Sequence, residues 1–203
     1  DDSERLLTAY RKVIKSTMLI TFACMLGLAA VAKPLIIILI GEQWLVAVHF
    51  LQIICFAGML YPLHAINLNM LQVKGRSDLF LKLEIIKKVI AIVPITLGIF
   101  YGIEWMLLGS VVTSFIAFFL NSFYSANLIG YPTKRQIADI FPAFAVSFFV
   151  SMIMWGVSFI DISYYFLLPI QIFIGLVLAF FIYERLHLSE YLEVKQMMLS
   201  LIK

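Results

Sequence analysis

The sequence predicts an all-α polytopic membrane protein, and composition is the first reason. Hydrophobic residues make up 63% of the 203 residues, charged residues 13%, and the mean hydropathy is +1.02. Soluble domains carry roughly 25% charged residues and about half apolar ones. The second reason is that the apolar residues gather in six long runs, and the third is that the polar segments between these runs alternate in charge.

The apolar runs predict six transmembrane helices. A helix crosses a hydrocarbon core of roughly 30 Å with about 20 apolar residues. Five runs reach this length alone, and the third reaches it only if it is extended back through Glu84 to about Leu81. The runs are Ser16–Ile40, Leu45–Val73, Val89–Tyr101, Trp105–Leu128, Ile140–Ile160 and Tyr164–Tyr183.

The placement of Lys and Arg orients the predicted bundle. Cytoplasmic loops of membrane proteins are enriched in these residues. We therefore expect both ends of the chain and the loops Lys74–Lys82 and Tyr131–Gln136 to be cytoplasmic, with Lys33 alone among the cations on the opposite side. The turns near Glu42, Glu104 and Asp161 then face outward. The net charge of +3 follows from this topology and does not indicate nucleic-acid binding.

Several expectations concern what the chain lacks. It opens on Asp1 and a charged amphipathic stretch to Lys15, which predicts a piece cut at a cytoplasmic loop. Cys24 and Cys55 lie inside apolar runs and are expected to be buried thiols rather than a disulfide or a metal pair. Because no phosphate loop, metal-ligand spacing or nucleophile elbow occurs, we expect no catalytic residue, metal or cofactor.

In the first helix, small residues predict close helix packing and a proline predicts a kink. Ala23, Gly27 and Ala30 share one face, and such faces let backbones approach closely in lipid. Pro34 should interrupt the helix, leaving a kinked extension, Leu35–Ile40, that ends at Gly41.

The second helix is the most polar of the six. Tyr61, His64 and Asn67 recur every three residues and so lie on one side of the helix, while Pro62 permits a hinge. Such a stripe either forms hydrogen bonds with neighbouring helices or lines a watery cavity, and the sequence leaves both possibilities open. A protonation switch at His64 is a third possibility.

The following turn and the third helix concentrate charge. Gly75 allows a tight turn, and Ser77 or Asp78 can cap the next helix, while Arg76 is free to reach a neighbour or a lipid headgroup. Farther along, Lys87 and Lys88 lie on the order of 10 Å inside the cytoplasmic boundary.

The lysine charges have two interpretations. Glu84 has the spacing to pair with Lys88, and lysine side chains can extend to the interface. One glutamate cannot neutralise two lysines, however, so a surplus positive charge remains that would suit an anionic substrate group in a cavity.

The fourth helix carries a stripe of small and polar residues that predicts a packing face. Its members are Ser110, Ser114, Ala117, Asn121 and Ser125, and Asn121 is the best candidate to face a cavity. Beyond the sixth run, Glu184–Lys203 is expected to be an amphipathic cytoplasmic tail.

The order and spacing of several short strings resemble one family from Asp1 to about Tyr131. The strings are Asp2-x-Glu4-Arg5-Leu6, Gly27-Leu28-Ala29, Lys33-Pro34-Leu35, Leu39-x-Gly41-Glu42-x-Trp44, Tyr61-Pro62-Leu63-His64-Ala65-x-Asn67-x-Asn69 and Lys74-Gly75-Arg76-Ser77-Asp78. Together they resemble the carboxyl-terminal half of Wzx-like polysaccharide and O-antigen repeat-unit flippases, a branch of the multidrug, oligosaccharidyl-lipid and polysaccharide exporter superfamily.

The resemblance implies a two-lobe exporter that moves undecaprenyl-diphosphate-linked oligosaccharides across the bacterial inner membrane by alternating access. Residues 1–131 would supply the last four helices of the second six-helix lobe, and residues 132–203 two additional helices and the tail. The partners implied are the lipid-linked substrate, membrane lipids and the missing N-terminal lobe.

Combining this resemblance with the residue chemistry yields a set of candidate substrate contacts. Lys87, Lys88 and Arg76 would hold phosphate, whereas Asn67, His64, Tyr61 and Asn121 would contact sugar or coupling ions. The alternatives are a cation-coupled drug exporter of the same superfamily, a membrane-embedded sugar or acyl transferase, and a purely structural helical partner. A transferase is disfavoured because the three histidines are scattered and lack a neighbouring carboxylate pair.

Overall fold

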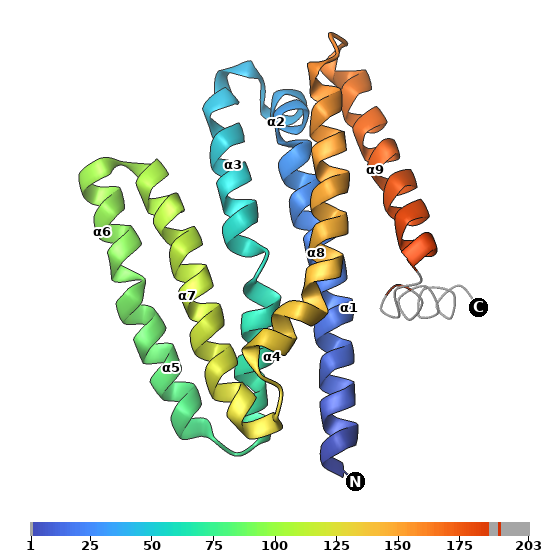
Figure 1. Cartoon of the computed structure of the whole chain (residues 1–203). Coiled ribbons are helices and arrows are strands. Elements are labelled where there is room, and N and C mark those ends of the chain that lie inside the picture. Colours follow the sequence, from blue (N-terminus) through green and yellow to red (C-terminus); the bar gives the residue numbers. More distant parts are fainter. Residues whose placement is uncertain (1, 187–190, 192–203) are drawn as a thin grey trace. The chain divides into compact units, whose positions relative to one another are not determined.

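The computed structural model describes residues 2–186 and residue 191, and within them it contains helices and no β-strand (Figure 1). Five helical stretches in this described part are long and apolar enough to cross a membrane. They are Glu4–Ala30, Glu42–Val73, Ile103–Ile129, Thr133–Phe159 and Tyr164–Leu186. The prediction of a polytopic α-helical membrane protein is confirmed. Most of the predicted tail, residues 187–190 and 192–203, lies outside the described residues.

The third predicted span is helical but is not among these five stretches. It forms α5 (Ser77–Ile90) and α6 (Ile92–Tyr101), which are separated only at Ala91. α6 is mostly apolar but only 10 residues long, and α5 carries five charged side chains. A sixth crossing therefore stays a prediction.

Large apolar side chains cover much of the helix surfaces. Ile99 and Phe100 are each 75% exposed, and Phe173 is 68% exposed. In water such surfaces would be unfavourable by roughly 25 cal/mol per Å² of apolar area. A bilayer removes that cost, because its hydrocarbon is as apolar as these side chains.

The chain divides into two compact units, which are described separately. The first unit contains the chain up to Ile14 and Phe56–Asp139. It includes four whole helices: α4 (Tyr61–Val73), α5, α6 and α7 (Ile103–Ile129). It also includes the start of α1 (Asp2–Ala30), the end of α3 (Leu45–Gly58) and the start of α8 (Thr133–Gly156). The second unit contains Lys15–Cys55 and the chain from Ile140 on. Its whole elements are α2 (Ala32–Ile40), the short helices η1 (Glu42–Trp44) and η2 (Val157–Phe159), and α9 (Tyr164–Leu186). The remaining parts of α1, α3 and α8 also belong to it.

Three helices end four residues before a proline: α1 at Ala30 before Pro34, α3 at Gly58 before Pro62, and α5 at Ile90 before Pro94. Proline has no amide hydrogen, and its ring clashes with the carbonyl four residues earlier, which favours a break at that point. Pro142 and Pro169 by contrast lie inside α8 and α9, which continue through them. The predicted kink at Pro34 thus lies at Val31, and the extension begins at Ala32 rather than Leu35. It ends at Gly41, whose φ of 94° confirms the predicted stop.

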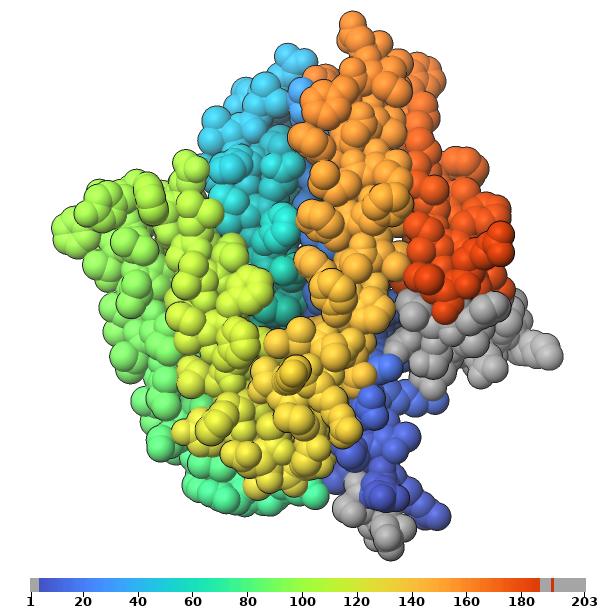
Figure 2. All heavy atoms as spheres, viewed as in Figure 1, coloured from blue at the N-terminus to red at the C-terminus, as the bar shows by residue number. Residues whose placement is uncertain are grey.

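In the first unit, α6 and α7 form a tight antiparallel hairpin, and their side chains pack directly on one another (Figures 1 and 2). Two glycines permit this contact. A Cβ added at Gly98 would lie 2.8 Å from Cβ of Met106, and one at Gly109 would lie 3.0 Å from Cβ of Pro94. The predicted close approach at Gly27 is wrong, because a Cβ there would meet no atom within 4 Å.

The second unit is held by aromatic and polar contacts. The rings of Phe22 and Phe144 meet edge to face at 5.3 Å, and the Ser147 and Tyr183 hydroxyls lie 3.1 Å apart. Gln171 donates to the backbone oxygen of Met154 at 2.8 Å. Of the two cysteines, Cys55 is buried as predicted, but Cys24 is exposed because it faces an apolar groove between α1, α8 and α9 of this unit.

Candidate functional site

A groove of about 580 Å³ in the first unit collects several of the predicted site residues. Its walls come from the end of α3 and from α4, α5, α6 and α7. The polar residues that line it are Tyr61 and His64 from α4, Glu84, Lys87 and Lys88 from α5, and Ser110, Thr113 and Ser114 from α7. The structure therefore brings four of the seven predicted contacts together: Tyr61, His64, Lys87 and Lys88.

The charges in the groove are arranged differently from the predicted ion pair. Glu84 pairs with Lys87, one position before the expected partner Lys88. Both spacings bring side chains together on a helix. Lys87 is the more enclosed of the two lysines, with 20% of its side chain exposed. An enclosed ammonium group loses more hydration, so a nearby carboxylate stabilises Lys87 more than it would stabilise Lys88. Lys88 lines the groove without an acidic partner among the described residues.

His64 forms a second polar feature of the groove. It is 8% exposed, and its Nε2 atom is buried without a hydrogen-bond partner in the described part of the chain. The ring centroid of the exposed Tyr61 lies 5.8 Å from that of His64. A buried ring nitrogen without a partner is costly, so a ligand group or water that reached it would be stabilised there.

Asn67 does not line the groove, because it is fully buried and its amide is fully used. Its Oδ1 accepts from the Tyr10 and Ser125 hydroxyls, each at 2.7 Å, and its Nδ2 donates to the Leu63 carbonyl at 3.1 Å and to Gln136 Oε1 at 3.0 Å. Four bonds are all that an amide side chain can make. In this structure Asn67 joins helices.

The stripe on α7 faces the end of α3 and α4, in agreement with the predicted packing face. Ser114 donates to the Ala57 carbonyl at 2.8 Å, and Asn121 reaches the backbone oxygen of His64 at 3.5 Å. Asn121 is fully buried and lies outside the groove lining, with its Oδ1 lacking a partner among the described residues.

Arg76 lies away from the groove, in the exposed turn before α5. It donates two hydrogen bonds to Asp78, at 3.0 and 2.9 Å, and these bonds lower the pKa of Asp78. Gly75 has φ of 70°, as its predicted role in a tight turn requires. The N-cap position is Arg76, which forms no side-chain cap, so neither Ser77 nor Asp78 takes the predicted N-cap position. The Asp78 carboxylate does lie in the first turn of α5, where it is bound by Arg76.

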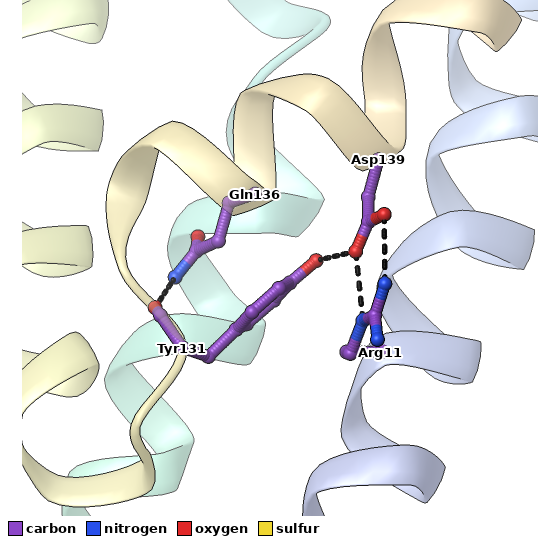
Figure 3. Close-up of polar contacts among 4 residues, drawn as sticks. All are labelled: Arg11, Tyr131, Gln136 and Asp139. Atoms are coloured by element: carbon purple, nitrogen blue, oxygen red, sulfur yellow. Dashed lines mark hydrogen bonds and ion pairs between the residues drawn. The ribbon is translucent and has the colours of Figure 1, made fainter.

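A partly buried polar cluster in the first unit was not predicted from the sequence (Figure 3). Arg11 donates to both carboxylate oxygens of Asp139, at 2.8 and 3.0 Å, and the Tyr131 hydroxyl donates to the same carboxylate at 2.6 Å. The Arg11 guanidinium also lies 5.6 Å from the Tyr131 ring centroid. Burial, followed by the bond to Asp139, raises the pKa of Tyr131.

This cluster is linked to Asn67 through Gln136, which is fully buried. Gln136 donates to the Tyr131 backbone oxygen at 3.3 Å and accepts from Asn67, so the start of α1, α4, α7 and the start of α8 share one hydrogen-bonded network. One sequence signal pointed to it. A single carboxylate, Asp139, stands at the edge of an apolar run, where an ion needs a partner.

Comparison with known proteins supports the resemblance seen in the sequence. A family described as "Polysaccharide biosynthesis protein" matches residues 1–49. The chain is 26% identical over 150 residues to a Klebsiella pneumoniae protein named "Uncharacterized membrane protein in cps region", with 73% of this chain and 30% of that protein covered.

Two further relatives carry functional names. Identity is 25% over 165 residues to the lipopolysaccharide biosynthesis protein WzxC of Escherichia coli K12, covering 77% of this chain and 34% of WzxC. It is 24% over 153 residues to the teichuronic acid biosynthesis protein TuaB of Bacillus subtilis 168, covering 73% and 31%. The chain thus spans about a third of the length of these relatives. No solved structure matches the chain.

Proposed function

Since this chain is related to the Wzx-like polysaccharide exporters, we propose that it is part of a flippase for undecaprenyl-diphosphate-linked oligosaccharide repeat units. The flippase moves these units across the bacterial inner membrane by alternating access. The observation that carries the proposal is the pair of lysines, Lys87 and Lys88, in a groove within a membrane helical unit.

The chemistry of the groove suits a diphosphate headgroup. A diphosphate needs cations in a hydrated cleft, and charge-assisted hydrogen bonds from ammonium groups are stronger than neutral ones. Lys87 and Lys88 contact the phosphates in this proposal, and Tyr61 and His64 contact the first sugar. The polyprenyl chain stays in lipid, for which the exposed apolar side chains of α5 and α6 provide a matching surface.

The other predicted contacts take supporting roles. Asn67 and Asn121 hold α4 against its neighbours and so position His64, which lies one helical turn from Asn67. Arg76 lies at the membrane surface, where its charge interacts with lipid headgroups.

The proposed topology places both ends of the chain in the cytoplasm, with α5 and α6 together forming the sixth crossing. The alternation of cationic polar segments supports this orientation. In the assembled exporter, residues 1–131 form the last four helices of the second lobe, and residues 132–203 add two helices and a tail.

The test is neutralisation of the groove lysines in the full-length protein. Lys87→Met and Lys88→Met keep most of the side-chain volume and remove the charge. We expect the double variant to bind geranylgeranyl diphosphate in nanodiscs at least tenfold more weakly and to export less polymer in cells.

The matched control is Lys82→Met, on the same helix but outside the groove lining. It should bind and export normally. The proposal fails if the double variant folds and neither diphosphate binding nor polymer export changes.

A further inference from the structure

Glu84 and Lys87 form an ion pair in the wall of the groove, and both side chains are only partly enclosed. The exposed fraction is 34% for the Glu84 side chain and 20% for Lys87. The Glu84 carboxylate lies beside the Lys87 ammonium group, where an anion bound to Lys87 would also have to lie.

We propose that Glu84 is an internal competitor for Lys87. With the groove empty, the carboxylate neutralises Lys87; when an anionic ligand binds, Lys87 exchanges Glu84 for the ligand, and the return of Glu84 favours release. This inference rests on the proposed anion-binding role of the groove, and it assigns Glu84 the role of setting how tightly the anion is held.

While the groove is empty, Glu84 is the counter-charge of Lys87. Removing an ammonium group from water is costly unless an opposite charge lies nearby. Glu84 supplies that charge from the preceding helical turn, so Lys87 can remain charged inside the groove between transport events. Without Glu84, the groove would hold two unpaired lysines, Lys87 and Lys88.

An arriving anion can contact Lys88 before it reaches Lys87. Lys88 lines the same groove and has no acidic partner in the described part of the chain, so it can make the first contact. The bound anion then lies close to the Glu84 carboxylate, and like charges at this separation repel one another. Since a third of the Glu84 side chain is exposed, it can turn toward solvent when Lys87 changes partner.

Glu84 also favours release of the anion. A transporter must bind its substrate and also let it go, so a site with two uncompensated lysines would hold a diphosphate too long. A tethered carboxylate competes at high effective concentration, because it is attached one turn from Lys87. Glu84 thereby weakens binding without blocking it.

The experiment compares Glu84→Gln with the native full-length protein in nanodiscs, using geranylgeranyl diphosphate as the probe. We expect on the order of tenfold tighter binding, because a nearby like charge is removed while partial exposure limits the effect. Dissociation should slow by a similar factor. Binding of uncharged geranylgeraniol should not change, and neither should either ligand's affinity in Glu42→Gln, the same substitution at an exposed turn of the other unit.

A double variant identifies the partner. In the Lys87→Met background, Glu84→Gln should improve diphosphate binding less than in the native background, because the exchange of partners no longer takes place. Glu84→Asn is a second neutral replacement, to be used if Glu84→Gln does not fold.

The outcomes separate the two proposals. If Glu84→Gln leaves diphosphate binding unchanged or weakens it while the lysine variants still lose binding, the competitor role is wrong and the anion site stands. If the lysine variants bind normally, the anion site itself is wrong.

Discussion

Arg11 and Asp139 are 128 residues apart in the chain, yet they form a two-bond ion pair at 2.8 and 3.0 Å. The Asp139 side chain is 13% exposed and also accepts a hydrogen bond from Tyr131. The pair joins the start of α1 to the start of α8 within one compact unit. A carboxylate this enclosed depends on its donors, because an unpaired buried charge is strongly unfavourable.

Breaking this pair should destabilise the protein. Arg11→Ala removes one positive charge and two hydrogen bonds from the Asp139 carboxylate, and we expect a loss of about 1–3 kcal/mol, below the usual range for a buried pair because Arg11 is 38% exposed. Thermal unfolding in detergent measures the loss. The double variant Arg11→Ala, Asp139→Ala should recover part of it.

The exposed pair Arg76–Asp78 is the control for this prediction, since its side chains are 46% and 63% exposed. Arg76→Ala should leave the unfolding temperature unchanged, as exposed pairs contribute little. Equal losses for Arg11→Ala and Arg76→Ala would contradict a special role for the enclosed pair.

Asn67→Ala should destabilise the first unit by about 2–4 kcal/mol, because it leaves buried groups of Tyr10, Ser125 and Gln136 without their partner. Asn69→Ala, two positions along on the exposed side of α4, is the matched control and should have little effect. Denaturation of both variants in the same detergent provides the comparison, and similar stabilities would show that the network around Asn67 contributes little.

Gly109→Ala should weaken the α6–α7 hairpin. The added methyl group would lie 3.0 Å from Cβ and 3.2 Å from Cα of Pro94, and we expect a cost of about 1–2 kcal/mol from overpacking. Gly27→Ala is the control, because its methyl group meets nothing within 4 Å. The unfolding temperature should fall for Gly109→Ala and stay unchanged for Gly27→Ala. The reverse result would contradict the packing described for the hairpin.

The sixth crossing can be tested by thiol labelling. In a background with Cys24→Ser and Cys55→Ala, we expect Ser77→Cys to react with an impermeant reagent from the cytoplasmic side and Tyr101→Cys from the periplasmic side. Lys134→Cys is a cytoplasmic reference. Labelling of Ser77→Cys and Tyr101→Cys from the same side would show that α5 and α6 do not cross the bilayer.

Much of the fold was predictable from local sequence, because membrane helices are specified by composition. Runs of about 20 apolar residues are long enough to span, whatever the partner helices are. Backbone conformations were equally local: Gly41 and Gly75 adopt positive φ where a helix and a turn required it. Pro34 and Pro62 follow helix ends by four residues, as the missing amide and the ring favour, but Pro142 and Pro169 lie inside α8 and α9, so proline alone does not decide where a helix stops.

The candidate site was predictable only in part. Tyr61, His64, Lys87 and Lys88 share the groove, as residues on polar faces of neighbouring helices can. Spacing alone could not say that Asn67, one turn from His64, would be enclosed by Tyr10, Ser125 and Gln136. Nor could it choose between Lys87 and Lys88 as the partner of Glu84, since both lie within reach along a helix.

The sequence by itself therefore determined the membrane class and most of the helical runs, since each depends on the composition of adjacent residues. Only the tertiary structure decided where several helices end and which polar groups form hydrogen bonds with one another. Arg11 pairs with Asp139, 128 residues away, because packing of the first unit brings the starts of α1 and α8 together. No local sequence pattern predicts this contact.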